Sequence, residues 1–114
     1  MDTLRVEKKD NAVFAAFKGE ITLEITSELK KELEAAISDG KFESLIADLS
    51  EVNFMDSSGI GFLVALNTKI MGLAKKMYLY QPSAQVKKTF ELVQLSSFFS
   101  ILEQEEDLLA IMPD

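Results

Sequence analysis

The sequence predicts an α/β fold, with a mixed, mostly parallel β-sheet of about four to five strands and about four α-helices packed mainly on one face. After an opening hairpin, short apolar segments alternate with stretches of helical periodicity. Such alternation is typical of parallel strands joined by crossover helices. The 114 residues suit one domain and contain no linker or repeat, so residues 1–114 are expected to form a single domain.

The first third of the chain predicts a β-hairpin and one helix. Apolar and charged residues alternate over the first twenty residues, and Asp10-Asn11 is typical of a turn. Residues 23–39 predict an amphipathic helix, because apolar residues recur there at three- and four-residue spacing. Thr22 or Thr26 is the expected N-cap of this helix.

The middle of the chain predicts a buried strand and then a long helix. Residues 45–49 are almost continuously apolar, as expected for a strand covered on both faces. A polar block at residues 56–59 separates this strand from a helix that is expected to run to about Lys76. Lys75 and Lys76 would then lie at the negative end of the helix dipole.

The last third predicts two short strands and two helices. Residues 77–80 form an apolar and aromatic strand, and Pro82-Ser83 opens a helix. Residues 98–102 predict a last short strand. Residues 105–112 predict a closing helix with acidic residues in its first turn.

The composition excludes several classes of function. The chain has no cysteine and no histidine, which excludes disulfides, thiolate nucleophiles, cysteine zinc sites and histidine-based catalysis. Its 19 acidic and 12 basic residues give a net charge of -7, so binding to nucleic acid is not expected. No apolar run reaches the roughly 18 residues of a membrane span, and the start lacks the features of a signal peptide. We therefore expect a cytoplasmic protein without membrane insertion.

Most of the functional signal lies in the block Asp56-Ser57-Ser58-Gly59. In the simpler interpretation this block only caps the following helix, because Asp and Ser oxygens accept hydrogen bonds from unpaired N–H groups. In the other interpretation one serine is a regulatory phosphorylation site. The positive end and free N–H groups of a helix favour a phosphate there, which would lie beside Asp56.

The enzymatic alternatives lack partner residues. A nucleophilic serine needs a base, and neither serine of the block begins a Ser-x-x-Lys pattern. Gly59 and Gly61 start a dinucleotide-loop pattern, but Val64 stands at its third glycine position. Asp48 and Asp56, expected on separate loops, are a weak magnesium signal. We therefore expect no catalysis, metal or cofactor. The hypothesis that remains for an enzyme or nucleotide-binding protein is a small one that uses Asp48 and Asp56.

The helix after the block has apolar residues on two sides. One stripe at helical spacing is assigned to the core: Ile60, Leu63, Val64, Met71 and Ala74. Phe62, Leu66 and Leu73 fall on roughly the opposite side, in line with Lys69. Either a neighbouring helix covers this second stripe, or it is an exposed docking stripe one turn from Ser57. The docking interpretation predicts that Phe62 and Leu66 are substantially exposed.

These residues resemble a known family. The segments LIADLS at residues 45–50 and VNFMDSSGIG at residues 52–61 resemble the core signature of the bacterial anti-sigma factor antagonists, the STAS-domain proteins. The resemblance extends over essentially the whole chain. Residues 19–21 are similar to the family's turn after the second strand, and residues 82–90 are similar to the segment leading into its third helix.

The resemblance implies a single STAS domain over residues 1–114 that acts as an antagonist, not as an enzyme. It would bind an anti-sigma factor, a serine kinase of the histidine-kinase-like ATPase type, and so free a sigma factor for RNA polymerase. The resemblance makes Ser57 the phosphate acceptor and Ser58 the second candidate, surrounded by Asp56 and Gly59. Phosphorylation would end the binding, and a metal-dependent serine phosphatase would restore it.

The partner surface is expected to include residues from two parts of the chain: Glu20, Thr22, Phe62, Leu66 and Lys69. The family commonly has an acidic residue where this chain has Thr22, and this departure bears on partner identity. An alternative within the family is a constitutive accessory subunit of a larger assembly, such as a lipid transporter or a stress-signalling complex. The intact hydroxyl of Ser57 argues against it, because a constitutive subunit needs no phosphate acceptor.

Overall fold

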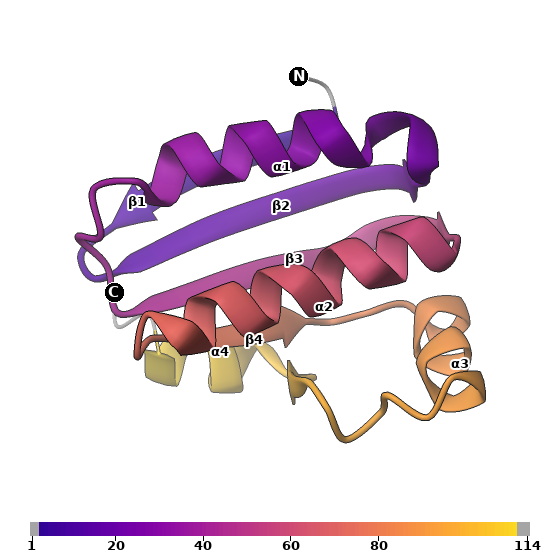
Figure 1. The fold of residues 1–114 in the computed structure, drawn as a ribbon. Helices are drawn as coiled ribbons and strands as arrows, with labels where there is room; N and C mark the ends of the chain where they lie inside the picture. The colour runs from indigo at the N-terminus through magenta and orange to yellow at the C-terminus, as the bar shows by residue number, and fades with distance from the viewer. Residues whose placement is uncertain (1–2, 112–114) are drawn as a thin grey trace.

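The computed structural model describes residues 3–111 as an alternation of strands and helices (Figure 1). In chain order the elements are β1 (Leu4–Lys9), β2 (Ala12–Ile21), α1 (Leu23–Ile37), β3 (Ser44–Met55), α2 (Ser57–Gly72), β4 (Lys76–Tyr80), α3 (Ala84–Leu92), β5 (Ser100–Leu102) and α4 (Glu105–Ile111). The α/β alternation predicted from the sequence is confirmed. Met112, predicted as the end of the closing helix, lies outside the described residues.

The sheet is mixed and mostly parallel, as predicted. Its strand order is β1-β2-β3-β4-β5, with β1 antiparallel to β2 and every other pair parallel. Glu20 pairs with Phe54, and Ile21 pairs with Met55. The carboxyl ends of β2 and β3 therefore lie side by side, and these two strands lead into α1 and α2.

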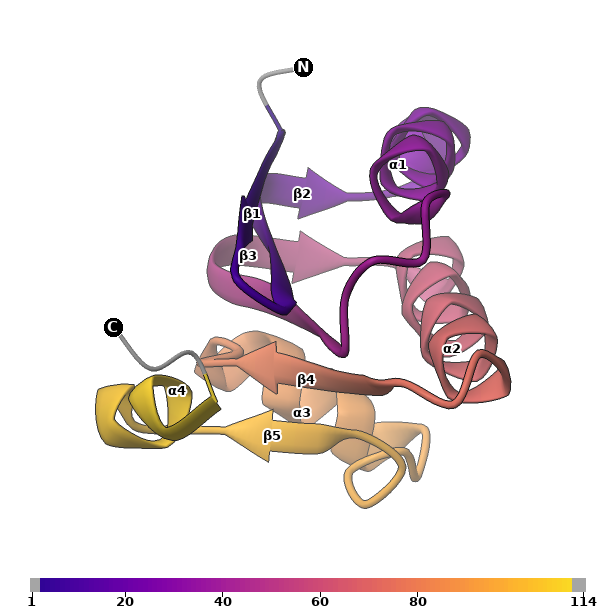
Figure 2. The same ribbon diagram turned by 90° about the vertical axis from the view of Figure 1, so that its left-hand side faces the viewer.

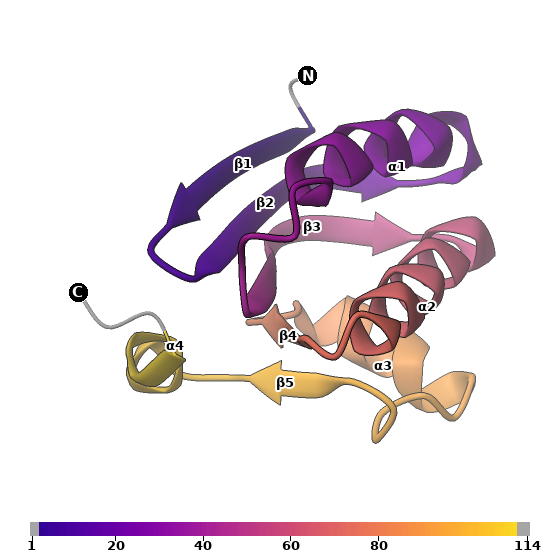
Figure 3. The same ribbon diagram turned by 60° about the vertical axis from the view of Figure 1, so that its left-hand side comes forward.

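The two longest helices share one face of the sheet. α1 and α2 pack against each other and against β2, β3 and β4 (Figures 1 and 2). Both helices begin at the end of the sheet where β2 and β3 finish, so they run in the same direction. α3 lies beyond the end of β4, whereas α4 follows β5 away from α1 and α2 (Figure 3). Among residues 3–111 no helix is long and apolar enough to cross a membrane.

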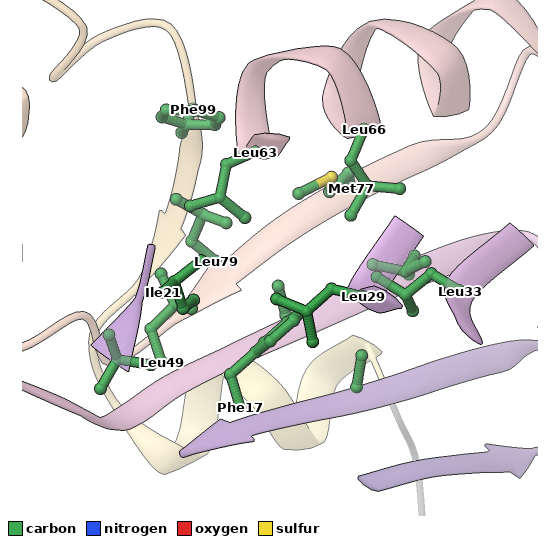
Figure 4. Close-up of a cluster of buried hydrophobic side chains, with 14 of the residues drawn as sticks. Phe17, Ile21, Leu29, Leu33, Leu49, Leu63, Leu66, Met77, Leu79 and Phe99 are labelled. Atoms are coloured by element: carbon green, nitrogen blue, oxygen red, sulfur yellow. The ribbon is translucent and has the colours of Figure 1, made fainter. Parts of the chain in front are cut away.

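The core lies between the sheet and these two helices. Figure 4 shows Leu29 and Leu33 of α1 facing the same cluster as Leu63 and Leu66 of α2, with Phe17 of β2 beneath them. All five side chains are buried. The apolar stripe predicted for the first helix therefore packs inward, and its burial fixes α1 beside α2.

The end of α2 differs from the prediction. The helix ends at Gly72 instead of about Lys76, and Ala74 then adopts a left-handed φ of 62°. Lys76 starts β4, and the Lys75 ammonium donates to the Phe42 carbonyl at 2.6 Å. The two lysines do not extend the helix, because the chain has to reverse sharply there to place β4 beside β3.

Two strands are longer than the sequence predicts. β3 runs from Ser44 to Met55, although β4 pairs with it only as far as Asp48. The remaining half of β3 packs against α3. Residues 19–21, expected to form a turn, belong to β2, where Gly19 has a φ of 88° and the register with β3 shifts. These extensions carry both strands to the start of their helices.

Candidate functional site

The Asp56 carboxylate connects the N-termini of two helices. Its Oδ1 accepts the Gly59 N–H at 2.9 Å, which caps α2. Its Oδ2 accepts the N–H of Leu23, the first residue of α1, at 3.2 Å. The first N–H groups of a helix have no partner within the helix, so one carboxylate satisfies a group in each. The capping interpretation is confirmed for Asp56.

Neither threonine caps α1 as expected from the sequence. Thr22 stands at the N-cap position with extended backbone angles, but its side chain makes no capping hydrogen bond. The Thr26 hydroxyl donates to the Leu23 carbonyl at 3.2 Å, within the helix. The capping prediction is therefore wrong in its choice of side chain, because Asp56 reaches the helix start from another strand end.

The two serines of the block have different surroundings. Ser57 is the first residue of α2 and is exposed, whereas Ser58 is half-buried and lines a groove beside α1. Within residues 3–111 no hydrogen bond involves the Ser57 hydroxyl. Ser57 is therefore open to solvent at a helix N-terminus, next to the Asp56 carboxylate.

Gly59 allows α2 to approach the ends of β2 and β3. A Cβ atom at this position would overlap the Ile21 carbonyl oxygen and lie 2.5 Å from Cγ of Met55. The Asp56 N–H also donates to the Ile21 carbonyl, at 3.3 Å. The block thus sits tightly on the strand ends, and any side chain at Gly59 would push α2 away from them.

The expected docking stripe on α2 is only partly covered, and Leu73, its last member, is 46% exposed just after the helix. Leu66 is only 6% exposed, so the expectation that it is exposed is wrong. Phe62 is half-buried and meets Phe17 edge-on, with ring centroids 6.1 Å apart. Lys69 is exposed and pairs with Glu34 of α1 at 3.2 Å. The alternative interpretation, in which a neighbouring helix covers this side, holds for Leu66 and in part for Phe62.

The predicted core stripe of α2 is correct only near the start of the helix. Ile60 and Leu63 are buried, and Val64 packs partly against the core. Met71 is 63% exposed, and Ala74 lies outside the helix. In the last turn of α2 the Met71 side chain therefore faces solvent, whereas Ile70 beside it is buried.

A groove runs between α1 and α2, with a cavity of about 330 Å³. We call it the α1–α2 groove. It is lined from both helices by Thr26, Ser27, Lys30, Leu33, Glu34, Ser58, Phe62, Ala65, Leu66 and Lys69. It includes three of the five predicted partner-binding residues together with the second candidate serine. The sequence did not predict it, because it depends on the packing of two separate helices.

Two exposed apolar residues lie beside the serine block. Leu23 begins α1 and is 69% exposed, and Phe54 lies two residues before Asp56 and is 41% exposed. Glu20, the register partner of Phe54, is exposed, and Thr22 is half-buried. Sequence reasoning missed both apolar residues. The parallel pairing of β2 with β3 places the start of α1 beside the end of β3, and a local sequence pattern does not reveal that pairing.

Asp48 lies within β3, as the predicted strand over residues 45–49 requires, and not on a loop as the magnesium interpretation assumed. Its Oδ1 accepts the Ser50 N–H at 2.9 Å, and Tyr80 is its register partner on β4. Burial, followed by the charges of Glu105, Asp48 and Glu106, raises the pKa of Tyr80 above its usual value. Among residues 3–111 no three carboxylates gather as a metal site would require.

The fold and the site define a class of protein. The sheet supports two parallel helices, and their N-termini meet at one aspartate and one exposed serine. The site thus presents an exposed hydroxyl beside a carboxylate that holds both helix starts. The chain belongs to the STAS domain family, since the model of that family matches residues 3–108.

Known relatives agree in sequence and in fold. The Anti-sigma F factor antagonist of Lysinibacillus sphaericus is 25% identical over 103 residues, which cover 90% of this chain and 87% of that protein. The crystal structure of an anti-sigma factor antagonist from Mycobacterium paratuberculosis superposes with a TM-score of 0.83 at 25% identity, over 98% of this chain and 94% of that one.

A further solved structure shares the fold: the Bacillus cell fate determinant SpoIIAA in its phosphorylated form. It superposes with a TM-score of 0.73 at 22% identity, over 95% of this chain and 98% of that one. The chain is thus a STAS-domain protein related to anti-sigma factor antagonists. These relatives are named for regulatory binding, which agrees with the sequence-based expectation that the chain is not an enzyme.

Proposed function

We propose that the protein is an anti-sigma factor antagonist that is switched by phosphorylation. Its unphosphorylated form binds an anti-sigma factor, a serine kinase of the histidine-kinase-like ATPase type, and so releases a sigma factor in the cytoplasm. Phosphate on Ser57 ends this binding, and a metal-dependent serine phosphatase restores it. The observation that carries the proposal is the exposed Ser57 hydroxyl on the first residue of α2, beside Asp56. The phosphorylated form of the related SpoIIAA supports it.

Accessibility favours Ser57 over Ser58 as the acceptor. A kinase must bring its nucleotide phosphate in line with the serine oxygen, which requires an approachable hydroxyl. Ser57 is exposed, whereas Ser58 is half-buried against the groove between the helices. A phosphate on Ser57 would also lie at the positive end of α2, where free N–H groups favour an anion.

The proposed partner surface is centred on the ends of β2 and β3. Glu20, Thr22 and Ser57 lie there with the exposed apolar side chains of Leu23 and Phe54. An apolar contact surrounded by polar residues is typical of the energetic centre of an interface. Within this proposal Lys69 and the exposed part of Phe62 extend the surface along α2. Leu66 contributes only as part of the groove wall, because it is buried.

The charge of the phosphate provides the switch. Phosphoserine adds a charge between about -1.5 and -2 at neutral pH. In the complex it would be buried against the partner within one residue of the Asp56 carboxylate. Burying a charge without a partner costs several kcal/mol. The same phosphate in the free protein stays in solvent, so the cost falls on the complex alone.

Affinity capture with three bait proteins tests the proposal. Wild type, Ser57→Ala and Ser57→Asp are used as baits in a lysate of the native cells, and captured proteins are identified by mass spectrometry. We expect wild type and Ser57→Ala to capture a histidine-kinase-like ATPase, and Ser57→Asp to lose it. ATP added to the captured complex should then place phosphate on Ser57 of the wild type. Equal capture by all three baits, or phosphate on another residue, would contradict the proposal.

A further inference from the structure

The α1–α2 groove has the composition of a small-molecule site. Its walls are mainly apolar, formed by Leu33, Phe62, Ala65 and Leu66. Its volume of about 330 Å³ lies at the lower end of the range of ligand pockets, which are typically apolar with a few placed polar groups. The space between helices is also a common position for such pockets.

The polar groups of the groove are unevenly distributed. Thr26, Ser27 and Ser58 place hydroxyl groups at the end where both helices begin. At the other end Glu34 and Lys69 form an ion pair at 3.2 Å and neutralise each other. The groove therefore has a hydroxyl-rich end and an electrically balanced end.

Lys30 leaves an unbalanced positive charge in the groove. It lines the groove between the two ends, and it forms no ion pair with any of residues 3–111. Glu34, four residues further along α1, is at the spacing that favours a helix pair, but its carboxylate is engaged by Lys69. On a chain of net charge -7, this local excess of positive charge is a distinctive feature of the groove.

We propose that the groove binds an amphipathic anion, specifically an aliphatic carboxylate. The carboxylate pairs with Lys30 and accepts hydrogen bonds from hydroxyls of Ser27 and Ser58, and the tail lies along the accessible surface of Phe62 and Ala65. The rise of the helix makes the distance from Ser27 to Glu34 roughly 10 Å along α1, which suits a medium-length chain such as octanoate. The groove is independent of the proposed phosphorylation of Ser57.

Charge complementarity selects the carboxylate over other amphipathic ligands. A cationic head group would be repelled by Lys30, and the Glu34 carboxylate is already paired with Lys69. A short carboxylate such as acetate would gain the ion pair but would leave the apolar walls exposed to water. The proposal therefore requires both the negative head group and the tail.

An NMR titration of the purified ¹⁵N-labelled chain with octanoate tests this site. We expect saturable shifts confined to amides of residues 26–34 and 58–69, with a millimolar dissociation constant, as is usual for so small a ligand. Octylamine, with a tail of the same length and the opposite charge, and acetate, with no tail, should bind at least tenfold more weakly. Shifts without saturation, shifts spread over the sheet, or equal binding of octylamine would overturn the proposal.

Matched variants separate the groove from the rest of the surface. Lys30→Glu should weaken octanoate binding at least tenfold, whereas Lys31→Glu makes the same change of charge on a residue outside the groove and should alter it less than twofold. Ala65→Leu should fill the groove and weaken binding, whereas Thr68→Leu should not. Equal losses for the two lysine variants would overturn the proposal. The purified chain is used alone, so this test is independent of any kinase or sigma factor.

Discussion

At the scale of single residues, Asp56 stabilises the starts of two helices, although it lies 33 residues along the chain from Leu23, the first residue of α1. Asp56→Ala removes the charged carboxylate that accepts hydrogen bonds from the Leu23 and Gly59 N–H groups. We expect the free energy of unfolding to fall by about 2 kcal/mol. Urea denaturation measures this difference. Glu51→Ala, which removes an exposed carboxylate from β3, should change the free energy by less than about 0.5 kcal/mol. Equal effects of the two variants would show that the Asp56 bonds contribute little.

Two glycines of α2 provide a matched pair of substitutions. A Cβ at Gly59 would overlap the Ile21 carbonyl oxygen, whereas a Cβ at Gly61 would meet no atom within 4 Å. We expect Gly59→Ala to lower the free energy of unfolding by about 3 kcal/mol, because backbone must move. Gly61→Ala should raise it by about 0.5–1 kcal/mol through helix propensity. Thermal unfolding of both variants checks the opposite signs, and a stable Gly59→Ala would mean that α2 adjusts its position easily.

The sequence predicts the Asp56 cap well, because the signal is local: a polar block stands between an apolar strand and a helical pattern. The choice of Ser57 over Ser58 as phosphate acceptor came from the family resemblance and stays a prediction. The positions of Leu23 and Phe54 beside the serine block are not predicted, because they depend on the parallel pairing of β2 with β3, which places the ends of both strands side by side. The position of Lys30 in a groove is not predicted for a similar reason, since it depends on the packing of α1 beside α2.

At the scale of elements, α2 is a helix whose buried side cannot be predicted from the spacing of its apolar residues. Apolar residues lie on most sides of this helix, so their spacing does not distinguish the side facing the sheet from the side facing α1. Leu66 was therefore expected in solvent, but it packs beside α1 and is buried. The ends of strands and helices are equally hard to predict. β3 continues past Asp48 because β2 and α3 supply its partners there.

Phe62 and Leu23 should give opposite results on substitution. Phe62→Ala removes a half-buried ring packed on Phe17, and we expect a loss of about 1–2 kcal/mol in the free energy of unfolding. Leu23→Ala removes an exposed side chain, and we expect a change below about 0.5 kcal/mol but a clear loss of affinity for the partner. Denaturation and titration calorimetry with the captured kinase compare the two. If Leu23→Ala lowers the free energy of unfolding, Leu23 contributes to the stability of the domain and not mainly to partner binding.

At the scale of the whole molecule, the architecture favours a switch that leaves the fold unchanged. Ser57 is exposed, and the block that carries it is fixed by hydrogen bonds to both Leu23 and Ile21. A phosphate there meets the positive end of α2, which stabilises an anion by a few tenths to about 1 kcal/mol. The core side chains packed under the start of α2, Ile21 and Met55, are apolar and offer the phosphate no polar partner. Phosphorylation therefore changes the surface and leaves the packing intact.

Because Ser57 is exposed and its block is fixed in place, the effects of phosphorylation should stay local. Amide chemical shifts should change only for residues 20–24 and 54–62, because Asp56 links the two helix starts. Thermal stability should stay the same or rise slightly. Affinity for the partner should fall more than a hundredfold, which corresponds to about 3 kcal/mol and matches the cost of burying an unpaired phosphate. Ser57→Ala treated with the same kinase and ATP is the control and should show none of these changes. Shifts that extend through β4, β5 and α3 would show instead that the phosphate rearranges the domain, and the switch would then be conformational.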